Sequence, residues 1–164
     1  MNPLLKRYRW SLGLFLTGLV LSGLTAFPLV TELRLLSEWL GFYDINQASS
    51  QPGNLFLIVY VYEALKETNA KFPFISYGTD WLAYGHLAIA VFFIRPFSKP
   101  LESDWVLRCG LICCAGVVPL ALIAGQIRGI PLCWRLFDCS FGVIGSIPLW
   151  YCLHLSRRMQ ATQK

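Results

Sequence analysis

Between residues 128 and 142 the chain reads RGIPLCWRLFDCSFG, a polar interruption between two long apolar runs. Two arginines and an aspartate, Arg128, Arg135 and Asp138, stand within this stretch, whereas the flanking runs carry almost no charge. If those runs cross a bilayer, the three charges lie at or just inside one membrane face, where an unpaired charge is costly. The stretch therefore predicts a membrane protein with a candidate polar site at this turn.

The composition of the whole chain agrees with a membrane location. Of the 164 residues, 55% are hydrophobic and 14% are charged, whereas a soluble domain carries about 25% charged residues. Although the net charge is +5, the basic residues form no stripe with interleaved aromatic residues, so no nucleic-acid partner is expected. They gather instead at the ends of apolar segments, as the loops of membrane proteins do.

Four apolar segments are long enough to span a bilayer, since about 20 helical residues cover a hydrocarbon layer of roughly 30 Å. The first is longer than the apolar core of a signal peptide, so we interpret it as an uncleaved helix. The predicted fold is all-α, a single membrane domain over residues 1–164 built as a four-helix bundle. A small helical cap is expected between the first and second helices. The spans are expected at about residues 10–30, 81–97, 105–126 and 136–155, with the insert at 31–80.

Local signals refine these spans. Pro28 is expected to bend or end the first helix, because proline cannot continue a helix without losing a hydrogen bond. The segment 72–78, rich in aromatic residues, proline and glycine, predicts turns before Asp80 opens the second span. Small residues that allow close helix packing recur every four positions. They are Gly18, Ser22 and Ala26 in the first span, and Gly142 and Ser146 in the last.

The insert is expected to hold two short helices. Thr31 is the predicted N-cap of the first, and Gly41 is predicted to close it. The polar residues of 42–53 indicate a loop. Asn54 is the predicted cap of the second helix, although the valines and tyrosines of 55–62 leave a β-strand open as the alternative.

The charge distribution predicts the orientation. If the N-terminus is inside, the inner segments hold nine basic and two acidic residues, a net +7, and the outer segments hold five basic and seven acidic residues, a net −2. This asymmetry predicts an even number of spans, with both termini cytoplasmic and the insert extracytoplasmic. The expected location is a bacterial-type inner (plasma) membrane.

On that topology a set of polar side chains gathers at the outer face. Its members, the candidate ligand-binding residues, are Asp80, His86, Arg128, Arg135, Asp138, Glu63 and Glu67. Arg135 and Asp138 are three residues apart and can pair along a helix. One interpretation is structural: these charges pair with each other, cap carbonyls and reach toward lipid headgroups. The other is a pocket under the insert that binds an anionic head group or performs acid–base chemistry.

The candidates for catalysis are His86, Asp138 and Cys139. Cys139, next to Asp138, could act as a nucleophile with His86 as its base and Arg128 or Arg135 holding an oxyanion, although the spacing matches no motif known to us. His86 and His154 are candidates for binding haem or a metal, but they lie near opposite membrane faces, so neither a haem between them nor a metal site is expected. Cys133 and Cys139 could form a disulfide, or could be small buried hydrophobic residues like the other cysteines.

The usual signatures of nucleotide hydrolysis, dinucleotide redox chemistry, zinc proteases and c-type haem attachment do not occur. We therefore expect an accessory or interaction subunit of a membrane complex, in contact with the bilayer and with other membrane subunits or a second copy. Whether the chain is an enzyme stays open. The alternatives are a membrane enzyme or a lipid or small-ligand binder that uses the polar set, and a haem- or pigment-binding subunit.

Overall fold

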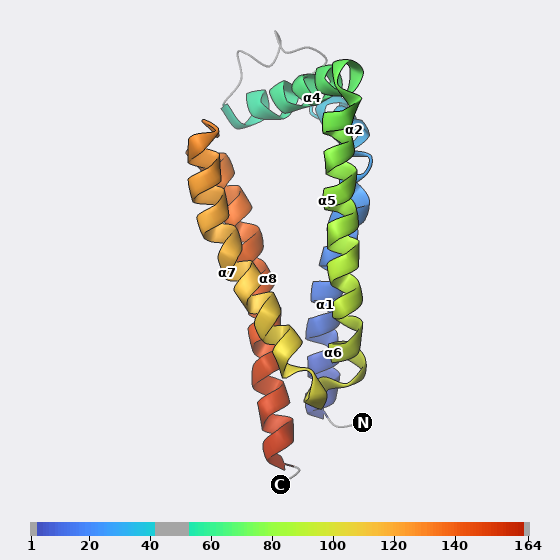
Figure 1. Ribbon diagram of the computed structural model, residues 1–164, viewed down its shortest axis with the longest axis vertical. Helices are drawn as coiled ribbons and strands as arrows, with labels where there is room; N and C mark the ends of the chain where they lie inside the picture. The colour runs from blue at the N-terminus through green and yellow to red at the C-terminus, as the bar shows by residue number, and fades with distance from the viewer. Residues whose placement is uncertain (1–2, 42–52, 163–164) are drawn as a thin grey trace. The chain divides into compact units, whose positions relative to one another are not determined.

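The computed structural model describes residues 3–41 and 53–162, apart from the side chains of 53–55 and 57. Every regular element in these residues is helical (Figure 1). Four helical segments are long and apolar enough to cross a membrane: Pro3–Ala26, Pro73–Ser98, Asp104–Ile127 and Leu132–Thr162. The chain is therefore an all-helical, multi-pass membrane protein, as the apolar runs predicted.

The chain divides into two compact units. Unit 1 comprises residues 1–19 and 89–164, and unit 2 comprises residues 20–88. The helix α1 (Pro3–Ala26) begins in unit 1 and ends in unit 2, whereas α5 (Pro73–Phe92) runs in the opposite sense.

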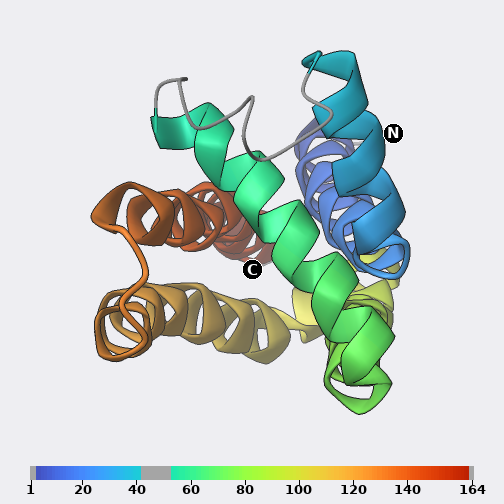
Figure 2. The ribbon, with the colours of Figure 1, turned by 90° about the horizontal axis from the view of Figure 1, so that it is seen from above.

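Unit 1 is built on a helical hairpin. In it α7 (Asp104–Ile127) and α8 (Leu132–Thr162) pack side by side along much of their length (Figures 1 and 2). The first part of α1 joins them, and the core includes the fully buried side chains Tyr8, Leu12, Leu107 and Leu149. Two short elements, α6 (Ile94–Ser98) and the 3₁₀ helix η1 (Pro100–Glu102), lead into α7. Because α8 is 31 residues long, or about 46 Å, it exceeds the hydrocarbon layer and reaches into the headgroup region at one or both ends.

Backbone hydrogen bonds from the turn between α7 and α8 end α7. Gly129 has a φ of +69°, a left-handed conformation that costs glycine little. The amide of Ile130 donates to the carbonyl of Gly125 (2.8 Å) and that of Gly129 donates to Gln126 (3.1 Å), which together satisfy two terminal carbonyls of α7. The helix α8 then begins directly after Pro131, four residues earlier than expected.

In unit 2, α1 ends at Ala26 and α2 (Leu29–Trp39) begins after Pro28, so the predicted break at this proline is confirmed. The predicted N-cap at Thr31 is wrong, because the helix starts earlier: the amide of Glu32 already donates to the carbonyl of Pro28 at 2.9 Å. The predicted end of the helix is confirmed, since Gly41 follows α2 with a φ of +79°.

The second helix of the insert, α4 (Gly53–Lys71), includes residues 55–62, so the β-strand alternative is wrong. Its later turns carry lysine–glutamate pairs at helical spacing, which support a helix whatever the strand preference of the residues before them. The helix packs against α2 (Figure 2) and runs across the direction of α5 rather than alongside it (Figure 1). Of the loop predicted at 42–53, residues 42–52 lie outside the described residues, and Gly53 already belongs to α4.

The predicted turns at 72–78 are also wrong, because α5 begins at Pro73. A proline has no amide hydrogen to leave unbonded, so it fits the first position of a helix. The packing of α1 on α5 in unit 2 uses a different glycine from the one expected. A Cβ at Gly23 would lie 3.0 Å from the carbonyl oxygen of Ala83, whereas a Cβ at Gly18 would meet open space.

Candidate functional site

The polar residues predicted to form a site divide between the two units. Arg128, Arg135 and Asp138 belong to unit 1, and Glu63, Glu67, Asp80 and His86 belong to unit 2. The surroundings of each residue within its own unit show which side chains are already bonded and which remain available to a ligand or partner.

Arg135 bonds to α7 rather than to its neighbour on α8. Its guanidinium donates to Gln126 Oε1 at 2.5 Å and lies 3.4 Å from the carbonyl oxygen of Leu122. The stem of the side chain passes over Gly125, where a Cβ would come within 2.6 Å of it. Arg135 therefore joins α8 to α7 at the turn end of the hairpin, and the missing side chain at Gly125 makes the space for it.

Because Arg135 bonds to α7, it does not pair with Asp138. Among the residues that the structure describes, no ion pair or hydrogen bond reaches the carboxylate of Asp138, and the pair with Arg135 that the spacing allows is not formed. Its neighbours on the same side of α8 are aromatic: the rings of Trp134 and Phe137 are 6.0 Å apart, and those of Phe137 and Phe141 are 5.2 Å apart. We call Trp134, Phe137, Asp138 and Phe141 the α8 face.

The candidates for catalysis have local contacts. The Cys139 thiol is buried against α7, with Sγ 3.9 Å from the carbonyl oxygen of Val118. His86 lies on α5, and its Nδ1 is 2.8 Å from the carbonyl oxygen of Leu82 on the same helix. Each contact is one that a side chain packed in a helical protein makes without any catalytic role, and the assignment of a nucleophile and base stays a prediction.

The disulfide alternative is not found. Cys133 and Cys139 are free thiols, as are the other four cysteines. The reason is geometric: both lie on α8, six residues apart, so their Cα atoms are separated by about 9 Å along the helix, beyond the reach of a disulfide.

The remaining candidates for haem, metal or anion binding lie on exposed positions. Arg128 is the exposed C-cap residue of α7. The ring of His154 stacks on Trp150 of the same helix, with centroids 6.3 Å apart. Within residues 3–41 and 53–162, no group of three or more histidine, cysteine, aspartate or glutamate residues is placed to hold a metal ion.

The two glutamates of α4 are paired with lysines of their own helix. Glu63 lies 3.5 Å from Lys66 and Glu67 lies 2.5 Å from Lys71. The hydrogen bond from Lys71, together with its positive charge, lowers the pKa of Glu67 below its ordinary value. Both ion pairs are exposed, which suits the surface of a helix rather than a buried ligand site.

Asp80 lines a cavity of about 390 Å³ in unit 2. Hydroxyl and amide groups share its wall, and the other lining side chains are apolar. The polar lining residues are Thr31, Asn69, Ser76, Tyr77, Thr79 and Asp80. With one carboxylate and no arginine or lysine, this lining suits a cationic or hydroxyl-bearing ligand and disfavours the anionic head group considered from the sequence.

A second polar cluster, at the other end of unit 1, was not anticipated. The buried hydroxyl of Ser156 on α8 hydrogen-bonds to Asp104 Oδ1 (2.6 Å) and lies 3.1 Å from the carbonyl oxygen of Pro100. One turn further along α8, Gln160 Nε2 donates to the carbonyl of Leu101 at 3.1 Å. These bonds tie the end of α8 to η1 and to the start of α7.

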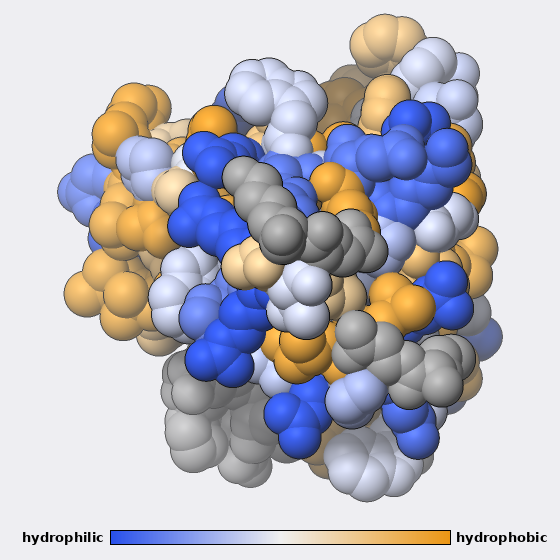
Figure 3. Space-filling model, turned by 90° about the horizontal axis from the view of Figure 1, so that it is seen from below, coloured by the Kyte–Doolittle hydropathy of each residue, from blue (hydrophilic) through white to orange (hydrophobic). Residues whose placement is uncertain are grey.

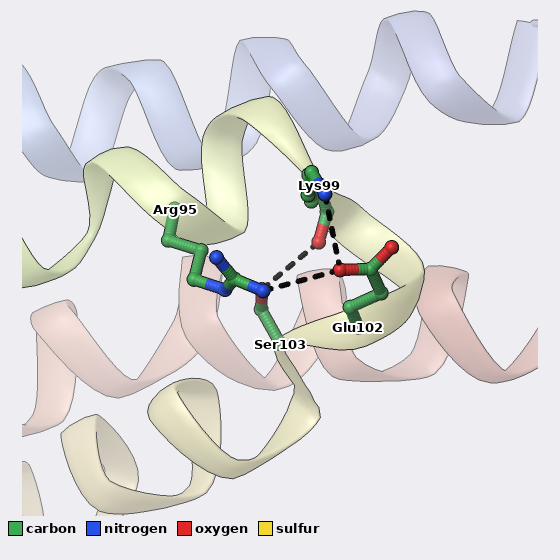
Figure 4. Close-up of polar contacts among 4 residues, drawn as sticks. All are labelled: Arg95, Lys99, Glu102 and Ser103. Carbon is green, nitrogen blue, oxygen red and sulfur yellow. Dashed lines mark hydrogen bonds and ion pairs between the residues drawn. The ribbon is translucent and has the colours of Figure 1, made fainter.

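The same end of unit 1 carries an exposed ion-pair group (Figure 4). Glu102 of η1 accepts from Arg95 at 3.2 Å and lies 3.5 Å from Lys99, while the hydroxyl of Ser103 donates to the carbonyl of Lys99 at 2.9 Å. The hydroxyl bond fixes the turn that leads from α6 into α7, whereas the exposed ion pairs contribute little.

The chain matches no protein-family model, no curated protein and no solved structure. The chain has four candidate spans, which identify it as an integral membrane protein.

Proposed function

We propose that this membrane protein is a non-catalytic accessory or interaction subunit, and that the α8 face binds a helix of another membrane protein or of a second copy. The observation that carries the proposal is the carboxylate of Asp138, which lies in a candidate span and has no bonding partner among the described residues.

The cost of that carboxylate is the first step. Asp138 is the seventh residue of α8, about 9 Å from the start of the helix. A charged side chain costs about 2.5–3.5 kcal/mol at the centre of a span and less toward a membrane face, and polar groups in spans characteristically pair with one another. Since Arg135 is bonded to Gln126, a lysine or arginine supplied by a partner helix is the natural counter-ion.

The aromatic neighbours are the second step. Phe137 and Phe141 are 56% and 59% exposed, and they flank Asp138 on the helix surface. Aromatic residues are enriched in protein interfaces relative to the rest of the surface. The α8 face therefore offers a partner both a charge to pair with and rigid surface to pack on.

The orientation belongs to the same proposal. In unit 1 the exposed basic side chains gather where the starts of α1 and α7 meet α6 and the end of α8: Lys6, Arg7, Arg95, Lys99, Arg108, Arg157 and Arg158. Hydrophilic groups gather on this end, seen from below in Figure 3. The positive-inside rule favours this end as the cytoplasmic one, in an inner (plasma) membrane.

The experiment compares affinity-tagged Asp138→Asn with wild type and with Glu63→Gln, a control acid on α4 outside the spans. Each is purified in mild detergent, and the membrane proteins that accompany it are quantified by mass spectrometry. We expect one such protein, or a second copy of this chain, to fall about tenfold or more with Asp138→Asn, as loss of a charge-assisted bond predicts.

A photoreactive residue at Phe137 adds a test of location, with the exposed Ile123 of α7 as the control position. The proposal expects protein crosslinks from position 137 and lipid crosslinks from position 123. Recovery that is equal for Asp138→Asn and wild type, together with lipid crosslinks alone at both positions, would refute it.

The cavity beside Asp80 supports a second candidate function, the binding of a small cationic or hydroxyl-bearing ligand. This candidate uses unit 2 only and is independent of the α8 face. The same purified samples test it, because a small molecule bound there would be found in the wild-type preparation by mass spectrometry of its extract.

A further inference from the structure

We propose that unit 1 holds an anionic phospholipid in a groove between α1 and α6, with its phosphate on Arg9 and one acyl chain along the groove. The groove encloses about 450 Å³ and is lined by Arg9, Trp10, Gly13, Leu14, Thr17 and Phe97. This inference concerns a lipid site and does not depend on the binding of a partner to α8.

The shape of the groove follows from residue spacing. Positions 10, 13, 14 and 17 lie on one side of α1 because three or four residues make a helical turn. Gly13 contributes no side chain there, and a Cβ on it would lie 3.7 Å from the Phe97 ring of α6. The missing side chain thus leaves a hollow whose far wall is an aromatic ring.

The lining separates into a charged end and an apolar length. From Arg9 to Thr17 the helix rises about 12 Å, and between them Trp10 and Leu14 are each 73% exposed. That length accommodates the upper part of an acyl chain, and a tryptophan beside a basic residue is typical of the depth at which lipid glycerol and phosphate groups lie.

The charge of Arg9 points to the sign of the head group. The Nε of Arg9 is buried and has no hydrogen-bond partner among the described residues, and no ion pair of the described chain includes Arg9. By contrast, Arg95 of α6 and Lys99, which directly follows α6, are both paired with Glu102. Because Arg9 lines the groove, a phosphate there would give its guanidinium an acceptor, and arginine binds phosphate through parallel hydrogen bonds.

The test uses the purified full chain in detergent, titrated with phosphatidylglycerol or with phosphatidylcholine of the same acyl chains. Native mass spectrometry measures the fraction of protein that carries one lipid. Wild type is expected to retain phosphatidylglycerol preferentially. Arg9→Gln should weaken this binding about tenfold or more, and Arg9→Lys should restore part of it. Arg7→Gln, an exposed basic residue outside the groove, should bind as wild type does.

Gly13→Leu tests the groove independently of charge, because its side chain would fill the hollow beside Phe97. It should weaken the retention of phosphatidylglycerol while Arg9 is still present. The proposal is overturned if Arg7→Gln and Arg9→Gln weaken binding equally, if wild type retains both lipids equally, or if Gly13→Leu binds as wild type does. Circular dichroism and gel filtration check folding, and if one groove variant fails to fold, the other decides.

Discussion

At Gly142 the contact between α7 and α8 leaves no room for a side chain. A Cβ there would collide with the carbonyl oxygen of Cys114 and come within 3.1 Å of Val117. A backbone carbonyl inside a helix cannot turn away as a side chain can. We therefore predict that Gly142→Ala destabilises the protein by about 1–3 kcal/mol, the usual cost of overpacking.

Gly116→Ala is the matched control, because a Cβ at Gly116 would meet open space on the same hairpin. Its alanine should be neutral or slightly stabilising, since alanine favours a helix by up to about 1 kcal/mol over glycine. Thermal unfolding in detergent, followed by circular dichroism, measures both variants. Equal stability of the two would show that the hairpin does not pack as closely as described.

The residue scale is also where prediction from sequence was weakest. Arg135 and Asp138 are at pairing distance along a helix, so their spacing allows a pair. The arginine instead bonds to Gln126 across the turn. Only the packing of α7 on α8 brings that amide within reach, and nothing in the spacing of the two residues signals it. The glycine at 125, which makes space for the arginine, is a signal that could have been noticed.

At the scale of elements, Ser156 joins α8 to the start of α7. Its fully buried hydroxyl hydrogen-bonds to Asp104. We predict that Ser156→Ala lowers the free energy of unfolding by about 1–2 kcal/mol, because a hydrogen bond to a charged group is lost and one carboxylate oxygen loses its donor.

Ser140→Ala is the control on the same helix. The hydroxyl of Ser140 donates only to the carbonyl of Phe137, one turn before it, so its loss should change stability by less than about 0.5 kcal/mol. Denaturation of both variants in mixed micelles provides the comparison. A Ser156 variant as stable as the Ser140 variant would mean that the bond between α8 and Asp104 contributes nothing.

The spanning helices were largely predictable, because an apolar run of about 20 residues with few or no charges is typical of a transmembrane helix. Their ends were less so. Pro73 was interpreted as part of a turn, although proline is equally suited to the first residue of a helix, and α5 begins there. The bond between Ser156 and Asp104 could not be predicted, because the two residues are 52 positions apart and neither belongs to a motif.

At the scale of the whole molecule, the proposed topology has four spans, and because this number is even, the two ends of the described chain lie on the same side of the membrane. Unit 1 bears the basic ends of α1 and α8, and both ends are expected in the cytoplasm. The helix α4 of unit 2 carries the exposed pairs Glu63–Lys66 and Glu67–Lys71 and is expected in water or at the headgroups on the opposite side. The gathering of basic residues in one set of segments is the pattern that the positive-inside rule describes for membrane proteins.

The most direct test labels introduced cysteines with a membrane-impermeant maleimide in intact bacterial cells. Lys66→Cys on α4 and Arg158→Cys on α8 are compared in a Cys133→Ser background, whose other cysteines lie within α7 and α8 and whose unsubstituted form is the blank. We predict that position 66 is labelled in intact cells and position 158 only after the membrane is permeabilised. Labelling of both positions from the same side would contradict the four-span topology.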